Sequence, residues 1–295
     1  MDVCVCTFRR LSVAGLLASL AKQQVPPSLR MRVIVADNDD TPSARETVAE
    51  AFRINGLDGV YLHAPARNIS IARNACLAAA DAELVAFIDD DEIAHAGWLN
   101  GLVAELERAK ADIVFGKVIA TYAADAPAWM PAADLHSTPA PFRNGQIDGG
   151  YTCNVLMRRE AVGALRFDPA FGRSGGEDTT FFAALKRAGA TMSYTADAVV
   201  DEPVTAARSS LKWLTARAYR SGQTYGLVRL GGGESRLKVA AVSLAKVVWC
   251  WGQAALTLWS PARWRRAAVR ANLHAGVMAA AMGRAPLELY GATGG

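Results

Sequence analysis

Short apolar runs alternate with amphipathic stretches along the N-terminal two-thirds of the chain. An uninterrupted apolar run of about four to eight residues is typical of a strand buried on both faces of a parallel sheet. Such runs predict strands at residues 3–7, 32–36, 60–63, 84–88, 112–121 and 149–157. Helices are predicted between them at residues 11–24, 43–55, 98–110 and 179–188, with a further helix ending at residue 80. This alternation predicts a doubly wound α/β fold, with a mixed, mostly parallel sheet flanked by helices.

The apolar run Leu84–Ile88 ends abruptly at consecutive carboxylates, Asp89, Asp90, Asp91 and Glu92. Ligands bind at the carboxyl edge of an open α/β sheet. Because side chains alternate along a strand, we expect Asp89 and Asp91 to point the same way and Asp90 the other. Clustered carboxylates repel unless a cation lies between them, and Mg²⁺ or Mn²⁺ prefers such oxygens. A divalent metal site is therefore predicted; the alternative is that Asp91 caps a helix beginning near residue 96 or 97.

Two further positions have the chemistry to contact a nucleotide. Asp37 follows the strand at residues 32–36 and could accept the imide N–H of uracil or a ribose hydroxyl, with ordinary turn chemistry as the alternative. Arg73 lies near the start of a helix, where phosphate is attracted, although it could equally be a surface charge. Residues 7–15 lack the glycine-rich turn of a dinucleotide site, so NAD or FAD is not expected.

A second informative stretch is the glycine-rich loop at residues 171–176, which leads into Glu177 and Asp178. Asp178 is a candidate general base on a loop whose glycines let substrate approach; the alternative is that it is the N-cap of the helix at 179–188. Residues 122–148 contain Trp129, several prolines and little periodicity. A loop of this length is usually functional or mobile, and we expect an acceptor-side flap there.

Charge is distributed unevenly along the chain. The total net charge of +4 combines a net charge of −7 over residues 1–202 with +11 over residues 203–295. A basic, Trp-rich C-terminal region predicts contact with anionic lipid or another polyanion. No nucleic-acid partner is expected, because the region lacks a recognisable nucleic-acid module.

Residues 237–259 form a long apolar stretch with basic residues at both ends. Its polar members recur at spacings of three and four, which places them in one stripe along a helix: Ser243, Lys246, Cys250, Gln253 and Thr257. A membrane-spanning helix would carry Lys246 near its centre at a cost of about 2.5–3.5 kcal/mol. We therefore expect an interfacial helix with its tryptophans at the headgroup level; burial against the rest of the chain and a true span are the alternatives.

Cysteine usage and the N-terminus bear on location. The five cysteines form no CxxC pair, and no charged-then-apolar leader precedes the first strand. A reduced, cytoplasmic location is therefore expected, peripheral at the inner face of the cytoplasmic membrane.

Taken together, these pieces resemble the family 2 glycosyltransferases with the GT-A fold, and among them bacterial exopolysaccharide and succinoglycan-type transferases. The matching segments cover about two-thirds of the chain in the right order: residues 3–9, 33–39, 68–74, 87–91, 149–154, 176–178 and 201–204, with Arg208. The resemblance implies a nucleotide-sugar-binding catalytic domain at residues 1–206 and a basic helical region at 207–295.

The resemblance assigns residues to the donor side of the site. Thr7, Arg9 and Asp37 would hold the nucleoside, and Arg73 would lie near the nucleotide. Asp89 and Asp91 would supply the DxD pair that meets Mn²⁺ or Mg²⁺ on the donor diphosphate, with Asp91 nearest the ion and Asp90 beside the donor.

The resemblance also implies the reaction and the acceptor side. Asp178 corresponds to the catalytic base of the ED motif, in an inverting transfer of one sugar from a nucleoside-diphosphate sugar, UDP-linked by expectation, to a glycan or lipid-linked acceptor. Glu177, Asn154 and Trp129 are assigned to the acceptor side.

Two departures from the family pattern leave questions open. A late histidine that often serves as a further metal ligand is replaced by Asp201 and Glu202, so the third ligand is undecided. The Gln-x-x-Arg-Trp signature of processive synthases is absent, which favours single-sugar addition. The alternatives are a sugar-phosphate nucleotidyltransferase, whose glycine-rich, lysine-containing loop is missing here, and a membrane-bound scaffold with a degenerate nucleotide pocket.

Overall fold

The computed structural model describes residues 1–138, 140, 142–143, 146–147 and 149–287. The chain divides into two compact units that interleave along the sequence. The sheet unit comprises residues 1–119, 137–172 and 177–202, and the helical unit comprises residues 120–136, 173–176 and 203–295. The expected domain boundary between residues 206 and 207 stays a prediction.

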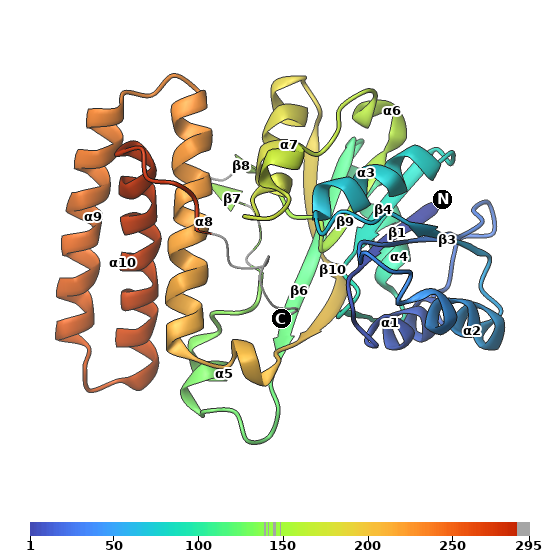
Figure 1. Cartoon of the computed structure of the whole chain (residues 1–295), viewed down its shortest axis with the longest axis horizontal. Helices are drawn as coiled ribbons and strands as arrows, with labels where there is room; N and C mark the ends of the chain where they lie inside the picture. The colour runs from blue at the N-terminus through green and yellow to red at the C-terminus, as the bar shows by residue number, and fades with distance from the viewer. Residues whose placement is uncertain (139, 141, 144–145, 148, 288–295) are drawn as a thin grey trace. The chain divides into compact units, whose positions relative to one another are not determined.

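In the described part of the chain, an eight-stranded sheet has the order β3-β2-β1-β4-β9-β6-β10-β5 (Figure 1). Its bounds are β1 Asp2–Thr7, β2 Arg32–Asp37, β3 Gly59–His63, β4 Leu84–Ile88, β5 Ile93–Ala94, β6 Ile113–Thr121, β9 Asn154–Arg158 and β10 Met192–Pro203. The strands β1 to β4 pair in parallel, whereas β9 runs antiparallel to both β4 and β6. The mixed, mostly parallel sheet expected from the sequence is confirmed.

Alternation along the central strands sends side chains into two separate cores. Val33 and Val35 pack on one face of the sheet, with helices α1 (Val13–Leu20), α2 (Arg45–Asn55) and α4 (Trp98–Ala109). Ile34 and Ala36 pack on the other face, with α3 (Ile69–Ala79) and α7 (Glu177–Arg187). Burial on both faces explains why these strands are continuously apolar.

Several boundaries differ from those expected. Helix α4 begins at Trp98 with Gly97 as its N-cap, and β5 lies between Asp91 and this helix, so Asp91 is not its cap. The strand expected at residue 149 begins only at Asn154. Gly150 packs on Phe115 instead, since a Cβ at Gly150 would lie 1.9 Å from the Phe115 ring.

The segment expected to be a flap contains short elements: α5 (Trp129–Ala133) and the hairpin strands β7 (Phe142–Arg143) and β8 (Gln146–Ile147). Residues 139, 141, 144–145 and 148 of the expected flap lie outside the described residues. The remaining short elements are α6 (Arg159–Val162), η1 (Pro169–Phe171) and η2 (Ala206–Arg208).

The helical unit contains three helices of equal length, α8 (Leu211–Gly231), α9 (Arg236–Leu256) and α10 (Pro261–Ala281). Glycines let α8 and α10 approach closely. A Cβ at Gly222 would lie 1.9 Å from the carbonyl oxygen of Leu273, and a Cβ at Gly276 would lie 1.9 Å from that of Tyr219. Among the described helices, α9 is the one that is long and apolar enough to cross a membrane.

Candidate active site

The loop that follows β4 is closed by its own last carboxylate. Glu92 is buried, and its Oε2 accepts the backbone N–H of Asp89 at 2.9 Å. Burial, together with the neighbouring carboxylates of Asp89 and Glu202, raises the pKa of Glu92 well above its usual range. The other oxygen, Oε1, is buried and has no hydrogen-bond partner among the described residues. Glu92 thus holds the shape of the acidic loop.

Asp90 and Asp91 are gathered by Arg10, a residue that the sequence did not single out. The Arg10 Nη1 lies 2.8 Å from Asp90 Oδ1 and 2.8 Å from Asp91 Oδ2. Thr7 Oγ1 donates to Asp90 Oδ2 at 2.7 Å. Burial raises the pKa of Asp90 to about 6 against the opposing effect of Arg10. The prediction that Asp90 points away from Asp89 and Asp91 is therefore wrong. Strand β4 ends at Ile88, and beyond it Asp90 and Asp91 both pair with the Arg10 guanidinium.

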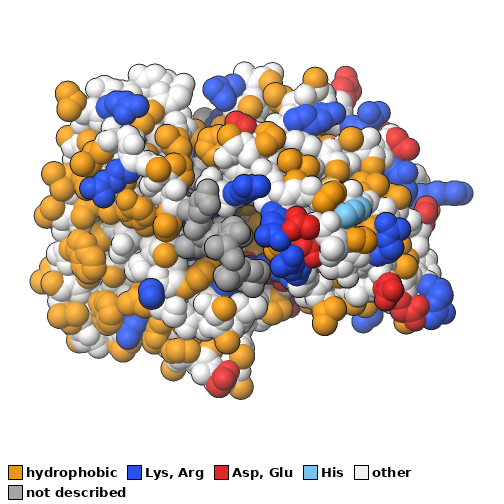
Figure 2. All heavy atoms as spheres, in the orientation of Figure 1, with side chains coloured by type: hydrophobic (Ala, Val, Ile, Leu, Met, Phe, Trp, Pro, Cys, Tyr) orange, Lys and Arg blue, Asp and Glu red, His pale blue; other side chains and the backbone are white. Residues whose placement is uncertain are grey.

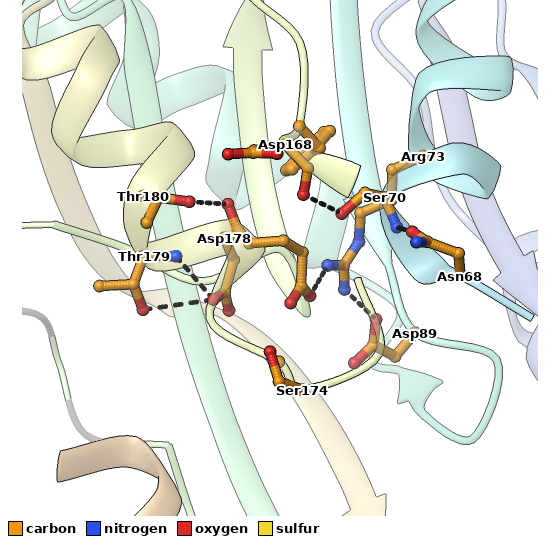
Figure 3. Close-up of polar contacts among 12 residues, drawn as sticks. Asn68, Ser70, Arg73, Asp89, Asp168, Ser174, Asp178, Thr179 and Thr180 are labelled. Carbon is orange, nitrogen blue, oxygen red and sulfur yellow. Dashed lines mark hydrogen bonds and ion pairs between the residues drawn. The ribbon is translucent and has the colours of Figure 1, made fainter. Parts of the chain in front are cut away.

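Arg73 links the acidic loop to the start of α7 (Figure 3). It lies one turn into α3, whose N-cap Asn68 accepts the backbone N–H groups of Ser70 and Ile71. The buried guanidinium forms an ion pair with Glu177 and lies 3.7 Å from Asp89 Oδ1. Burial alone would lower the pKa of Arg73, but the carboxylates of Glu177, Asp89 and Asp178 raise it. Acids from two distant parts of the sequence therefore converge on this one cation.

Asp178 lies in the first turn of α7, which begins one residue earlier at Glu177. Its Oδ1 accepts the Thr179 backbone N–H at 2.6 Å and the Thr179 hydroxyl at 3.3 Å. Carboxylates in the first turn interact favourably with the helix dipole, which favours the ionised form that a general base requires. Asp178 is only partly buried.

Glu177 was expected to contact the acceptor, but its surroundings do not support this role. Its side chain is buried, and Oε1 pairs with Arg73. The second oxygen, Oε2, is buried without a hydrogen-bond partner among the described residues. Glu177 therefore positions Arg73, and direct contact with an acceptor is not what its burial supports.

The hydrogen bonds of Asp37 and Asn154 differ from those that their predicted roles require. Asp37 is fully buried: Oδ1 accepts the Asp39 N–H at 3.0 Å, and Oδ2 accepts from the Ala44 N–H at 2.8 Å and the Tyr61 hydroxyl at 2.7 Å. A carboxylate so engaged shapes the turn after β2 and does not face a ligand. Asn154 is 2% exposed and binds the Trp98 indole N–H and the carbonyls of Lys117 and Ala198, so it joins sheet and helix instead of facing an acceptor.

Arg9 and Trp129 complete the predicted set. Arg9 is half-exposed, and its Nε donates to Asp39 Oδ1 at 2.9 Å. Asp39 is therefore the acid on this turn that contacts a residue predicted to bind the nucleoside. Trp129 belongs to α5 in the helical unit, where the guanidinium carbon of Arg265 lies 4.8 Å from the centre of its ring. Its assignment to the acceptor side stays a prediction.

The glycines before Glu177 serve packing within the helical unit. Gly175 and Gly176 have φ of +82° and +101°, in the region that favours glycine. A Cβ at Gly175 would lie 2.1 Å from Arg220 Nη1, and one at Gly176 would lie 2.2 Å from Thr224 Cγ2. Close approach of the loop to α8 therefore explains these glycines, and the expected role of admitting substrate stays a prediction.

Asp89 and Asp91 are the residues of the acidic loop that could hold a divalent ion. Across residues 1–138, 140, 142–143, 146–147 and 149–287, no group of three or more His, Cys, Asp or Glu side chains could hold a metal. Asp89 is 43% exposed and Asp91 13%, and two carboxylates suffice for Mg²⁺ when substrate phosphates supply further ligands. Asp201, one candidate for a third ligand, is engaged with His95 Nε2 at 3.0 Å.

Comparisons with known proteins identify the family. The model of "Glycosyl transferase family 2" matches residues 2–166. The "Succinoglycan biosynthesis protein ExoM" of Rhizobium meliloti (strain 1021) is 44% identical over 296 residues, which cover 99% of this chain and 96% of that protein.

Solved structures of Staphylococcus aureus TarS share the fold. TarS 1–349 in complex with UDP-GlcNAc has a TM-score of 0.55 at 17% identity, with 96% of this chain and 93% of that chain covered. A longer TarS structure has a TM-score of 0.54 at 18% identity, and the present chain spans 55% of its length. At this identity the likeness shows the GT-A fold alone. The family match and the near-full-length relative establish that the chain belongs to glycosyl transferase family 2 and is a glycosyltransferase.

Proposed function

We propose that this enzyme is a metal-dependent, inverting glycosyltransferase in cell-surface polysaccharide biosynthesis. It moves one sugar from a UDP-linked donor to a hydroxyl of a glycan or lipid-linked acceptor. The succinoglycan biosynthesis protein supports the pathway class, and the TarS complex with UDP-GlcNAc supports the donor class.

One observation carries the proposal: Arg73 is paired with Glu177 and lies beside Asp89, and the charges of Asp89 and Asp178 both act on it. The acids after β4 and the acid at the start of α7 therefore belong to one site. A transferase needs this convergence, because a donor diphosphate and an acceptor hydroxyl must meet at one anomeric carbon.

Each group has a distinct task in the transfer. Asp178 takes the proton from the acceptor hydroxyl, which attacks the anomeric carbon from the face opposite the leaving group. Asp89 and Asp91 would hold a divalent ion, and such an ion would neutralise charge on the departing nucleoside diphosphate. Arg10 and Thr7 fix Asp90, and Glu92 fixes the backbone of Asp89, so that the loop is preorganised. No covalent intermediate is required.

The helical unit extends the proposal to location. The exposed apolar side chains of α9 and the net charge of +11 over residues 203–295 support peripheral association with the inner face of the cytoplasmic membrane. A transferase placed there would reach a lipid-linked acceptor without extracting it from the bilayer.

A donor screen tests the proposed reaction. The full chain is incubated with UDP-, GDP- and dTDP-sugars in Mn²⁺ or Mg²⁺, and release of nucleoside diphosphate is measured with and without lipid extract as the acceptor source. Release from one UDP-sugar that requires the metal is the expected result. Pyrophosphate release from a nucleoside triphosphate and a sugar phosphate would indicate a nucleotidyltransferase, and the absence of metal-dependent nucleotide binding would indicate a scaffold.

A further inference from the structure

Helix α9 buries only part of its polar stripe, because Lys246 is exposed, and it exposes most of its large apolar side chains. Ser243 and Cys250 are buried with Val239 and Ala254, and α9 packs along α10. The outward side chains are mostly apolar and strongly exposed: Leu237 83%, Leu244 51%, Val248 64%, Trp249 69%, Trp251 51%, Leu256 74% and, just beyond the helix, Leu258 66% and Trp259 73%.

This distribution is the reverse of that in a helix which covers a water-soluble core. In the face drawn in Figure 2, hydrophobic side chains cover most of the area of α9, with few charges among them. A contiguous apolar surface rimmed by polar groups marks an interaction site, because water is a poor solvent for it. Three exposed tryptophans on and just after one helix favour a bilayer interface, where an aromatic ring meets both headgroup and acyl chain.

The rim of this surface is a groove of about 360 Å³ between α9 and α10, lined by Trp249, Thr257, Arg263, Arg266 and Arg270. Arg263 stacks on Trp259, with 5.1 Å from its guanidinium carbon to the ring centre. Arg266 donates to the carbonyls of Ala132 and Ala133. The groove therefore presents guanidinium groups next to exposed tryptophans.

Arg263 and Arg270 have no acidic partner on the two helices that border the groove. Arg263 and its neighbours lie in the first turns of α10, where positive charge opposes the helix dipole. Neither α9 nor α10 contains an acidic residue that could pair with them. Guanidinium groups recognise phosphate oxygens through planar, bidentate hydrogen bonds, and an anion in the groove would stabilise this arrangement.

We propose that the groove between α9 and α10 binds the phosphate of an anionic phospholipid while the outer face of α9 enters the bilayer interface. The inference rests on the membrane association proposed above and names its site and ligand. A polyanion without acyl chains would leave the apolar face of α9 uncovered. A transmembrane insertion would take the arginines of α10 into the hydrocarbon, because α9 packs along α10.

Binding of the full chain to vesicles tests the groove. We expect sedimentation with phosphatidylglycerol–phosphatidylcholine vesicles and none with phosphatidylcholine alone. The double variant Arg263→Glu/Arg270→Glu should bind at least about tenfold more weakly. The matched control is Lys238→Glu/Arg284→Glu, which makes the same change in net charge at the other end of the helix pair, where Arg236 reaches the Ala281 carbonyl. Equal losses in the two double variants, or no loss in the first, would overturn the assignment of the groove.

A second pair of variants tests the apolar face. Trp249→Gln and Leu11→Gln each replace one strongly exposed apolar side chain, but Leu11 belongs to the sheet unit. We expect only Trp249→Gln to weaken vesicle binding. A stable dimer in sedimentation without vesicles, dissociated by Trp249→Gln, would show that a second copy covers this face and would overturn the proposal.

Nucleotide binding separates this inference from the proposed reaction. All variants should bind UDP with Mn²⁺ as the wild-type chain does, because they lie in the helical unit or on the surface. If the wild-type chain binds vesicles but no nucleotide, the proposed reaction fails and the lipid groove stands. If the wild-type chain binds nucleotide but not vesicles, the groove is not a lipid site and the proposed reaction stands.

Discussion

The carboxylate of Asp178 is held by Thr179 and lies in the electrostatic field of Arg73, which suits a base that must stay ionised. Asp178→Asn keeps the shape and hydrogen bonds but removes proton acceptance. We expect kcat to fall by about 10²–10⁴-fold while donor affinity is unchanged. Measured kcat and UDP-sugar affinity decide the matter, with Asp197→Asn on the exposed part of β10 as the control. Wild-type turnover in Asp178→Asn would refute the assignment of the base.

Asp91 offers a sharper test of the metal. Removing this carboxylate leaves Arg10 paired with Asp90, so the loop keeps one of its two anchors. We expect Asp91→Ala to lose the Mn²⁺-dependent part of UDP binding, by at least about tenfold, because one of two protein ligands is gone. Asp40→Ala, which removes an exposed acid paired with Arg67, should bind UDP normally in isothermal titration. An unchanged response of Asp91→Ala to Mn²⁺ would exclude Asp91 as a ligand.

Residue types at strand ends could be predicted from the sequence, but their partners could not. Asp89, Asp91 and Asp178 were singled out because acids follow buried strands or precede helices, and their roles stay predictions. Asp37 was misassigned because its direction depends on the N–H of Ala44 and the hydroxyl of Tyr61, which only the folded turn brings together. Arg10 was missed since nothing in a single arginine after a strand indicates that it will meet two carboxylates.

At the scale of elements, continuous apolar runs predicted the central strands well, because those strands are buried on both faces. β10 was not predicted, since its run Met192–Pro203 mixes polar and apolar residues. α10 was not predicted, because its sequence is rich in alanine and arginine and shows no clear helical spacing of large apolar residues. The polar stripe of α9 was recognised, but which of its residues face protein depends on neighbours that the sequence does not name.

The crossing of α8 and α10 depends on glycine. Gly222→Ala would place Cβ 1.9 Å from the carbonyl oxygen of Leu273, a backbone atom that cannot turn away, so the helices must separate. We expect a loss of about 1–3 kcal/mol in the free energy of unfolding. In Gly252→Ala, within α9, the new Cβ would meet no heavy atom of the described residues within 4 Å. Urea unfolding should show that this control is unchanged or more stable by about 0.5–1 kcal/mol; equal losses in both variants would contradict the packing argument.

The segment after α5 is joined to the start of α8 by His136. The ring stacks on Trp213 with centroids 5.7 Å apart, and Nε2 lies 3.1 Å from the Arg208 carbonyl oxygen. Burial, and beyond it the charges of Arg217 and Arg208, lower the pKa of His136, although its bond to the Arg208 carbonyl opposes this. Because the pKa of His136 is lowered in the folded state, protonation of its ring in acid is less favourable in the folded chain than in the unfolded chain.

The sign of the pH effect follows. Below the pKa of the unfolded state, about 6.5, the unfolded chain binds a proton that the folded chain resists, so stability falls as pH falls. We expect the free energy of unfolding to drop between about pH 7.5 and pH 5.5 in the wild-type chain and to drop less in His136→Gln. Urea titrations at the two pH values measure the difference. An equal drop in both proteins would show that His136 does not contribute.

The whole molecule pairs an acidic sequence, net −7 over residues 1–202, with a basic one, net +11 over residues 203–295. On the proposals above, the acidic part would bind a cation and the basic part an anionic surface. Attraction between exposed arginines and a lipid surface is screened by salt over a Debye length of about 10 Å at 0.1 M. Buried or partly buried pairs, such as those of Arg73 and Arg10, are screened far less.

Salt should therefore separate the two activities of the chain. Raising NaCl from about 50 mM to about 500 mM should weaken binding to phosphatidylglycerol vesicles by at least about tenfold, because the arginines of α10 are largely solvated. UDP release from the donor in free solution should change by a much smaller factor, since the acidic loop is ordered by buried contacts. Vesicle sedimentation and nucleotide release, measured on one preparation, provide the comparison. If both fell in parallel, membrane binding and catalysis would share their charged groups, and a division of labour between the two parts of the chain would be untenable.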